Sequence, residues 1–328
     1  MESPLASRAI TEIIDRERLE KRLASGAPLR IKFGIDPSKP ELHIGHMVAL
    51  RVLRRFQDAG HTAVLLIGDY TAQLGDPSDR SEARKILSEA EVKANAARYL
   101  DQVYAIMDKD KTEVRYNSEW YGQFGMRDVI ELLAKVTVNQ LLGHETFSKR
   151  LDNSLPLSMH EMIYPIMQGY DSVALKADVE LGGQDQKFNV LMGRVLQRQS
   201  DQPEQDIVLC RYLPGIDGQA KMSKSLGNTI NLTDSPADMF GKVMSIPDSL
   251  IITYFELATN VPVAEVETYE ERLADSTTNP RDIKEILAKQ IVAEYHSQDD
   301  ALAAAEQFAR VFRQGEVPED IEELILSA

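Results

Sequence analysis

Residues 29–68 read LRIKFGIDPSKPELHIGHMVALRVLRRFQDAGHTAVLLIG, and this stretch decides the fold. Two apolar runs, residues 29–35 and 62–68, are bounded by glycine, proline or aspartate, and they predict buried strands. Residues 46–59 between them carry apolar side chains at helical spacing and end before Gly60. A strand, a helix and a second strand in this order predict a right-handed βαβ unit with parallel strands.

The rest of the chain extends this pattern. The N-terminus, residues 1–23, is interpreted as a polar helix. Further helices are expected at residues 88–107, 126–142, 236–257, 282–296 and 299–314, and further strands at residues 178–181 and 206–210. The predicted fold class is therefore α/β. A doubly wound, Rossmann-like parallel sheet forms a catalytic domain over residues 1–220, with a helical insertion around residues 120–160, and an α-helical domain follows over residues 221–328.

Composition excludes several classes of protein. A length of 328 residues is typical of about two domains, and the formal net charge of −15 disfavours a generic polyanion binder. The charge is uneven, because residues 251–328 carry 6 Lys and Arg against 17 Asp and Glu. The single cysteine, Cys210, excludes an intrachain disulfide and a thiolate zinc site. No apolar run approaches the roughly 18 residues of a membrane span, and no signal peptide is recognisable, so we expect a cytoplasmic protein without a membrane partner.

A first candidate site follows the first predicted strand, at the place where open α/β sheets bind ligands. His43-Ile44-Gly45-His46 stands at the start of the next helix, and both imidazoles can face one point beside its positive end. Such a pair suits a polyphosphate. Taken alone, two histidines at this spacing are more often ordinary hydrogen-bonded residues.

A second candidate site is KMSKS, residues 221–225, which follows the turn-rich stretch PGIDGQA. Lys221 and Lys224 are flexible point charges suited to phosphate, although a solvated loop is an equally good reading of this stretch alone. The two motifs in this order, about one α/β domain apart, are the paired signatures that class I aminoacyl-tRNA synthetases carry, and the chain resembles that class.

Three further segments narrow the resemblance to the bacterial tyrosyl-tRNA synthetases, from about Leu29 onward. They are the helical stripe YPIMQGYD over residues 164–171, GGQDQ over residues 182–186, and GDPSDR over residues 75–80. The resemblance implies three contacts to the tyrosine ammonium, from Tyr164, Gln168 and Asp76. It also implies that Asp171 accepts from the phenol hydroxyl and that Gln186 lies near the carboxylate. Lys32 stands where one branch of the family has a tyrosine that touches the same hydroxyl, and we count it with the tyrosine-binding residues.

The resemblance also implies the ATP site. Its expected members are Asp36, Ser38, His43, Gly45, His46, Gly183, Asp185, Lys221, Met222, Lys224, Arg80 and Arg84. Among them, His43, His46, Lys221 and Lys224 are the expected catalytic residues, and the two arginines would face the pyrophosphate. The structural alternatives are a helix cap or surface carboxylate for Asp171, a turn residue for Asp76, and a solvated face for Arg80 and Arg84.

The implied reaction is activation of tyrosine with ATP and Mg²⁺ to tyrosyl-adenylate and pyrophosphate, followed by transfer to tRNA(Tyr). No structural metal is expected. The family implies a homodimer, with residues 120–148 as the candidate interface, and an anticodon-binding type of helical domain. It also implies a basic RNA-binding domain, which we expect to be missing after Ala328. The alternatives are a tryptophanyl-tRNA synthetase, whose indole has no hydroxyl, and a non-catalytic RNA-binding paralogue.

Overall fold

Contacts divide the chain into two units in the computed structural model, which describes residues 3–78, 87–224 and 226–314. The first unit is Met1–Leu42 with His46–Tyr212, and the second is Leu213–Ala328 with His43–Gly45. The division after Tyr212 lies a little before the boundary expected at residue 220. It also assigns three residues of the first motif to the second unit.

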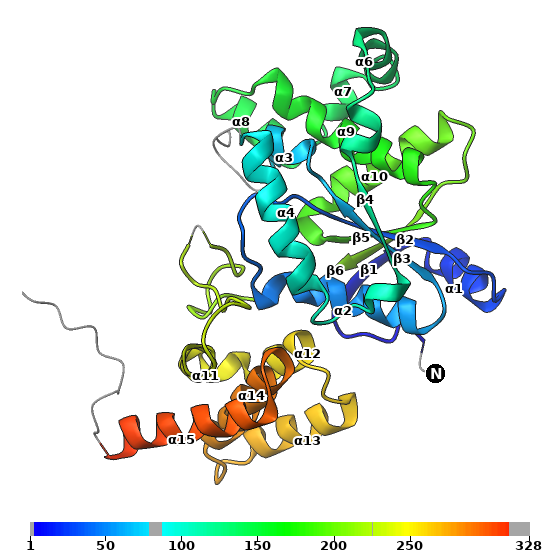
Figure 1. Ribbon diagram of the computed structural model, residues 1–328. Coiled ribbons are helices and arrows are strands. Elements are labelled where there is room, and N and C mark those ends of the chain that lie inside the picture. The colour runs from blue at the N-terminus through cyan, green and yellow to red at the C-terminus, as the bar shows by residue number, and fades with distance from the viewer. Residues whose placement is uncertain (1–2, 79–86, 225, 315–328) are drawn as a thin grey trace, which may run out of the picture. The chain divides into compact units, whose positions relative to one another are not determined.

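The first unit is built on a six-stranded sheet with the order β1-β6-β5-β2-β3-β4 (Figure 1). The strands are β1 (Ile10–Ile14), β2 (Arg30–Ile35), β3 (Thr62–Ile67), β4 (Thr112–Tyr116), β5 (Val179–Gly183) and β6 (Asp206–Cys210). All neighbours are parallel except β1, which pairs antiparallel with β6. β3 and β6 are buried almost throughout, as expected for parallel strands covered on both faces.

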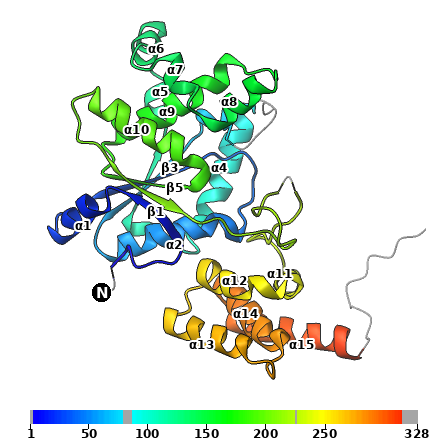
Figure 2. The same ribbon diagram turned by 180° about the vertical axis from the view of Figure 1, so that it is seen from behind.

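Helices cover both faces of this sheet. They are α1 (Arg16–Ala24), α2 (Ile44–Asp58), α3 (Thr71–Leu74), α4 (Glu89–Val103), α5 (Ser118–Tyr121), α6 (Met126–Leu133), α7 (Val138–Leu141), α8 (Glu145–Asp152), α9 (Met159–Leu175) and α10 (Lys187–Arg198), with short 3₁₀ turns at Lys109–Lys111 and Gln184–Gln186. From β2 the chain winds outward through β3 to β4, and from β5 it winds the other way to β6. Right-handed crossovers in opposite directions place their helices on opposite faces, and Figures 1 and 2 show α4 and α10 on opposite sides of the sheet. The winding reverses between β2 and β5, where such sheets bind ligands.

Three predictions about this unit need correction. The N-terminal helix expected over residues 1–23 is wrong for Ile10–Ile14, which form β1 because they pair with β6; only Arg16–Ala24 is helical there. The strand β4 was not predicted. The single helix expected over residues 126–142 is two helices, because α6 ends at Leu133 and Thr137 caps a new helix, α7, by accepting from the Gln140 N–H at 3.3 Å.

From Pro236 to the last described residue, Gln314, the second unit is built of helices. Its helices are α11 (Pro236–Ser245), α12 (Ile251–Ala258), α13 (Val263–Ala274), α14 (Pro280–Tyr295) and α15 (Gln298–Gln314), with a 3₁₀ turn at Asp248–Leu250. Ser235 and Asn279 cap α11 and α14, and a proline opens each helix where no N–H partner is needed. Phe240 and Val243 on α11 are buried, as are Ile283 and Leu287 on α14. Within the described ranges of the chain, no helix combines the length and apolar character needed to cross a membrane.

Candidate active site

The helix α9 brings the predicted tyrosine-binding stripe to the carboxyl end of β2. Tyr164 on this helix donates its hydroxyl proton to Asp36 Oδ2 at 2.9 Å, and Asp36 directly follows β2. Asp36 Oδ1 in turn accepts from the Thr71 hydroxyl at 2.8 Å. Because the Tyr164 proton is directed at Asp36, the phenol oxygen can act as an acceptor for a donor such as an ammonium group.

Asp171 lies at the other end of the stripe and is buried, with 2% of its surface exposed. Its Oδ1 accepts from the indole Nε1 of Trp120 at 2.9 Å, and its Oδ2 accepts from Asn117 Nδ2 at 3.4 Å. Burial raises the pKa of Asp171 to about 7, against the opposing effects of the Lys32 charge and these hydrogen bonds. A carboxylate has room for about four hydrogen bonds, so it can accept from a ligand hydroxyl as well.

Trp120 and Asn117 are site residues that the sequence analysis missed. Both follow β4, so they reach the same edge of the sheet as Asp36. Trp120 was expected to open an interface insertion, whereas it stands on α5 with its indole directed at Asp171. The insertion proper begins after it, with α6 at Met126.

The second part of the predicted tyrosine site is also assembled within the first unit. Gln186 Nε2 donates to Asp76 Oδ2 at 2.8 Å, which joins two segments far apart in the sequence. Asp76 Oδ1 accepts from the Ser78 N–H at 2.8 Å, and Asn189 Nδ2 donates to Gln186 Oε1 at 3.1 Å. These bonds fix a carboxylate and an amide beside each other, as a polar ligand would require.

Gly183 and Asp185, both predicted for the ATP site, lie at the end of β5 and in the turn that follows it. A Cβ atom on Gly183 would lie 2.7 Å from Asp185 Oδ1, so a larger residue here would force the Asp185 carboxylate to shift. The Asp185 N–H donates to the Tyr212 hydroxyl, which anchors the turn from the end of the first unit.

Lys32 has surroundings different from those predicted. It is buried, and its Nζ lies 2.8 Å from Glu180 Oε1, 2.8 Å from Ser172 Oγ and 3.0 Å from the Gln168 carbonyl oxygen. An ammonium group has three protons, and these three acceptors match them. The chain itself therefore satisfies Lys32, and a direct bond from Lys32 to the tyrosine hydroxyl would have to displace one of these partners.

The second unit brings residues 43–45 of the first motif together with the second motif. His43 forms a bridge with Asn231, and the Ile44 N–H donates to the Ile230 carbonyl oxygen at 3.0 Å. A Cβ atom on Gly45 would lie 3.0 Å from His43 Nδ1 and 3.4 Å from the Met222 Cβ atom. A glycine is therefore needed where the His43 ring and the KMSKS loop meet this turn.

Asn228 holds the KMSKS loop, and the sequence analysis missed this residue too. It is buried; its Oδ1 accepts from the Ser223 N–H at 2.8 Å, and its Nδ2 donates to the Lys221 carbonyl oxygen at 3.3 Å and to Asp217 Oδ2 at 3.1 Å. Lys221 and Lys224 are half-buried on the loop that these bonds hold.

The remaining predicted site residues lie in other segments of the chain. Ser38 lies in the loop after β2, where its N–H donates to the Asp36 carbonyl oxygen at 2.8 Å, and His46 lies on α2 with the first unit. Arg80, Arg84 and Ser225 lie outside the described residues. In the described part of the chain, no three His, Cys, Asp or Glu side chains gather in a way that could hold a metal ion.

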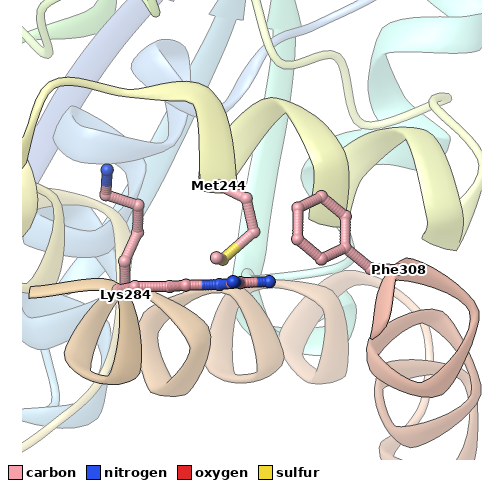
Figure 3. A pocket seen from close by; sticks show the side chains of 4 residues that line it. Met244, Lys284 and Phe308 are labelled. Carbon is pink, nitrogen blue, oxygen red and sulfur yellow. The ribbon is translucent and has the colours of Figure 1, made fainter. Parts of the chain in front are cut away.

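The second unit also contains a pocket of about 290 Å³, lined by Met244, Arg281, Lys284 and Phe308. Met244 on α11 and Phe308 on α15 point toward the same space, with Lys284 on α14 at its edge (Figure 3). Lys284 is already bound, because its Nζ lies 2.6 Å from the Ile246 carbonyl oxygen and 2.6 Å from Asp248 Oδ1. The pocket thus combines an arginine with apolar and aromatic side chains.

Sequence relatives match nearly the whole chain. A tyrosine–tRNA ligase from Moorella thermoacetica is 48% identical over 323 residues, which span 97% of this chain and 78% of the relative. A tyrosine–tRNA ligase from Dehalococcoides mccartyi is 49% identical over 319 residues, which span 97% of this chain and 81% of the relative. The family described as tRNA synthetases class I (W and Y) matches residues 24–313.

Solved structures agree with the fold. The C-terminally truncated mitochondrial tyrosyl-tRNA synthetase of Aspergillus nidulans superposes with a TM-score of 0.76 at 23% identity, covering 93% of this chain and 91% of that one. The tyrosyl-tRNA synthetase of Archaeoglobus fulgidus, complexed with L-tyrosine, has a TM-score of 0.72 at 21% identity, covering 91% and 97%. With the family match, these findings show that the chain belongs to the class I tRNA synthetases for tryptophan and tyrosine, ligases that use ATP to join an amino acid to tRNA.

Proposed function

We propose that the amino acid is tyrosine and that the site in the first unit binds it through the predicted residues. The observation that carries this proposal is the buried Asp171 carboxylate, which Trp120 and Asn117 hold at one end of the α9 stripe. A buried carboxylate that keeps room for a further hydrogen bond favours a ligand that donates one, as the hydroxyl at the far end of a tyrosine side chain would. The tyrosine-specific names of the most similar relatives support the same choice.

At the near end, the Tyr164 oxygen, the Gln168 amide and Asp76 would receive the ammonium group. Gln186, which is bonded to Asp76, would lie beside the carboxylate. The tyrosine carboxylate would then attack the α-phosphorus of ATP, and pyrophosphate would leave. This step needs no protein nucleophile, so positioning and stabilisation of the developing charge carry the catalysis.

For ATP we propose the two signature motifs, of which residues 43–45 and 221–225 belong to the second unit and His46 belongs to the first. His43 and His46 would bind the phosphates from one side, and Lys221 and Lys224 would neutralise the leaving pyrophosphate. Mg²⁺ would supply further charge neutralisation, held by nucleotide phosphate oxygens with its remaining sites on water.

We also propose a homodimer formed through the insertion between β4 and α9. Large apolar side chains are exposed there, namely Met126, Ile130, Val138, Leu151, Leu155 and Met159. Exposed apolar side chains gathered on one insertion are typical of an interface with another copy. The second unit would contact the tRNA, with Arg281 and Phe308 offering a cation and a ring for a phosphate and a base.

The test is ATP–pyrophosphate exchange with tyrosine, tryptophan or phenylalanine as the only amino acid. We expect rapid exchange with tyrosine and little with the other two. Exchange that is faster with tryptophan would contradict the proposed substrate, and no exchange with any of the three would contradict the proposed site.

A further inference from the structure

Lys32 and Glu180 form an ion pair inside the first unit, beneath the proposed tyrosine site. They are direct partners in the parallel pairing of β2 with β5, the place where the winding of the sheet reverses. Lys32 Nζ lies 2.8 Å from Glu180 Oε1, and each side chain is 1% exposed. Buried ion pairs add little net stability to a protein, and apolar side chains in the same place often add more. Stability alone therefore does not account for this pair.

The pair contacts α9 at the residues that face the substrate. Lys32 Nζ donates to the main-chain oxygen of Gln168 at 3.0 Å, and the Gln168 side-chain Nε2 donates to Glu180 Oε1 at 3.4 Å. Ser172, which directly follows Asp171, donates its hydroxyl to Glu180 Oε2 at 3.0 Å. Gln205 Nε2 also donates to this oxygen. The pair therefore holds α9 at Gln168, within the substrate-binding stripe, and at Ser172, directly after it.

The chemistry of Glu180 decides which way the Gln168 amide faces. A glutamate paired with a buried lysine is ionised, and an ionised carboxylate only accepts hydrogen bonds. It can bind the Nε2 end of the Gln168 amide but repels the Oε1 end. An ammonium group, with three donors, needs the Oε1 end, since the Nε2 end would oppose it.

We infer that Glu180, held by Lys32, is a positioning residue that keeps the Gln168 amide with Oε1 toward the substrate amino group. The inference rests on the proposed function, because it takes Gln168 as a contact of the tyrosine ammonium. Glu180 thereby contributes to selectivity for an α-amino acid without touching it. Lys32 contributes by holding the Glu180 carboxylate in the ion pair, in place of a direct contact to the phenol hydroxyl.

The experiment compares two ligands, tyrosine and 3-(4-hydroxyphenyl)propionate, which lacks only the amino group. Their dissociation constants are measured by calorimetry with the full chain. Glu180→Gln can donate to the Gln168 oxygen and so permits the reversed amide. We expect it to weaken tyrosine binding by at least about tenfold while the des-amino ligand binds within about threefold of its original affinity.

Two further variants separate positioning from loss of structure. Lys32→Met combined with Glu180→Met removes both charges at similar volume and is expected to fold, because apolar replacement of a buried pair is often tolerated. In this double variant too, the ratio of the dissociation constant of the des-amino ligand to that of tyrosine should fall. Glu161→Gln is the matched control: Glu161 is a buried carboxylate on the same helix, 2.6 Å from Arg150, and its loss should leave the ratio unchanged.

The outcomes are distinct. The positioning role is overturned if the ratio of the two dissociation constants is unchanged in both Glu180 variants, whether neither ligand or both ligands bind more weakly. The proposed function then still stands. Failure of the unsubstituted chain to bind tyrosine overturns the proposed function, and this inference with it.

Discussion

The indole Nε1 of Trp120 donates to Asp171 Oδ1 at 2.9 Å, and this bond joins α5 to α9 across the carboxyl edge of the sheet. It is one of the interactions that lower the pKa of Asp171 against the effect of burial. A donor that favours the ionised carboxylate also favours its use as an acceptor. Under the proposed function, Trp120 would therefore act on tyrosine through Asp171.

Replacing Trp120 by Phe keeps a ring at this place but removes the donor. We expect tyrosine binding at pH 7 to weaken by about tenfold, since a hydrogen bond to a charged group is lost, while phenylalanine binding changes little. Equilibrium binding of the two amino acids measures the effect. Equal weakening of both would show that the indole serves packing alone.

Asp171 makes tyrosine binding dependent on pH. Its pKa is raised to about 7, mainly by burial, so part of the population is protonated at neutral pH. A phenol hydroxyl bonds best to the ionised carboxylate, so binding lowers this pKa and releases a proton. The affinity for tyrosine should therefore rise as the pH increases from about 6 and level off above about 8, since the carboxylate is then almost fully ionised before binding.

The control for this dependence is Asp171→Asn, which has no proton to lose. Its tyrosine affinity should be weaker at high pH and flat between about pH 6 and 8. Phenylalanine binding to the original chain should not strengthen with pH. An affinity profile in Asp171→Asn that parallels the original one would assign the titration to another group.

Lys221→Ala and Lys224→Ala should slow adenylate formation by about 10²–10³ while the tyrosine Kd stays nearly unchanged. The reason is that these lysines are proposed to act on charge that develops at the leaving pyrophosphate. Single-turnover kinetics give the rate, and equilibrium binding gives the Kd. Lys242→Gln is the control, because Lys242 lies in the same unit and is paired with Asp234 at 2.6 Å. A raised tyrosine Kd with an unaltered rate would contradict the assignment.

Sequence patterns predicted the fold where the pattern repeats over a whole element. β2, α2 and β3 were expected to within a few residues, because their buried side chains follow a strict helical or strand pattern. β4 escaped prediction because it is an edge strand that carries Glu113 and Arg115, so no apolar run marks it. Missing β4 also concealed Asn117 and Trp120, which reach the site only through that strand.

The site was predictable where its residues share one helix, and less so where it depends on register. Tyr164, Gln168 and Asp171 share a face of α9, which the helical period alone indicates. The pairing of Lys32 with Glu180 depends on which residues of β2 and β5 lie opposite each other. That register cannot be read from the pattern of a single sequence. Lys32 was expected at the ligand from the family resemblance alone, although its three acceptors come from the chain.

Arg281 provides a test of RNA contact that is independent of amino acid activation. It lines the pocket with Phe308, and Arg281→Gln removes one charge and keeps most of the volume. If this arginine meets a phosphate of tRNA, the variant should raise the KM for tRNA in charging and reduce the slope of log affinity against log salt by about one. Pyrophosphate exchange, which uses no tRNA, should be unchanged. Lys289→Gln is the matched control on the same helix, because Lys289 is paired with Glu285 at 2.8 Å and does not line the pocket. Equal effects of the two variants would show that Arg281 contributes only to the overall charge of this unit. An unaltered KM and salt slope in Arg281→Gln would show that this pocket is not part of the RNA-binding surface.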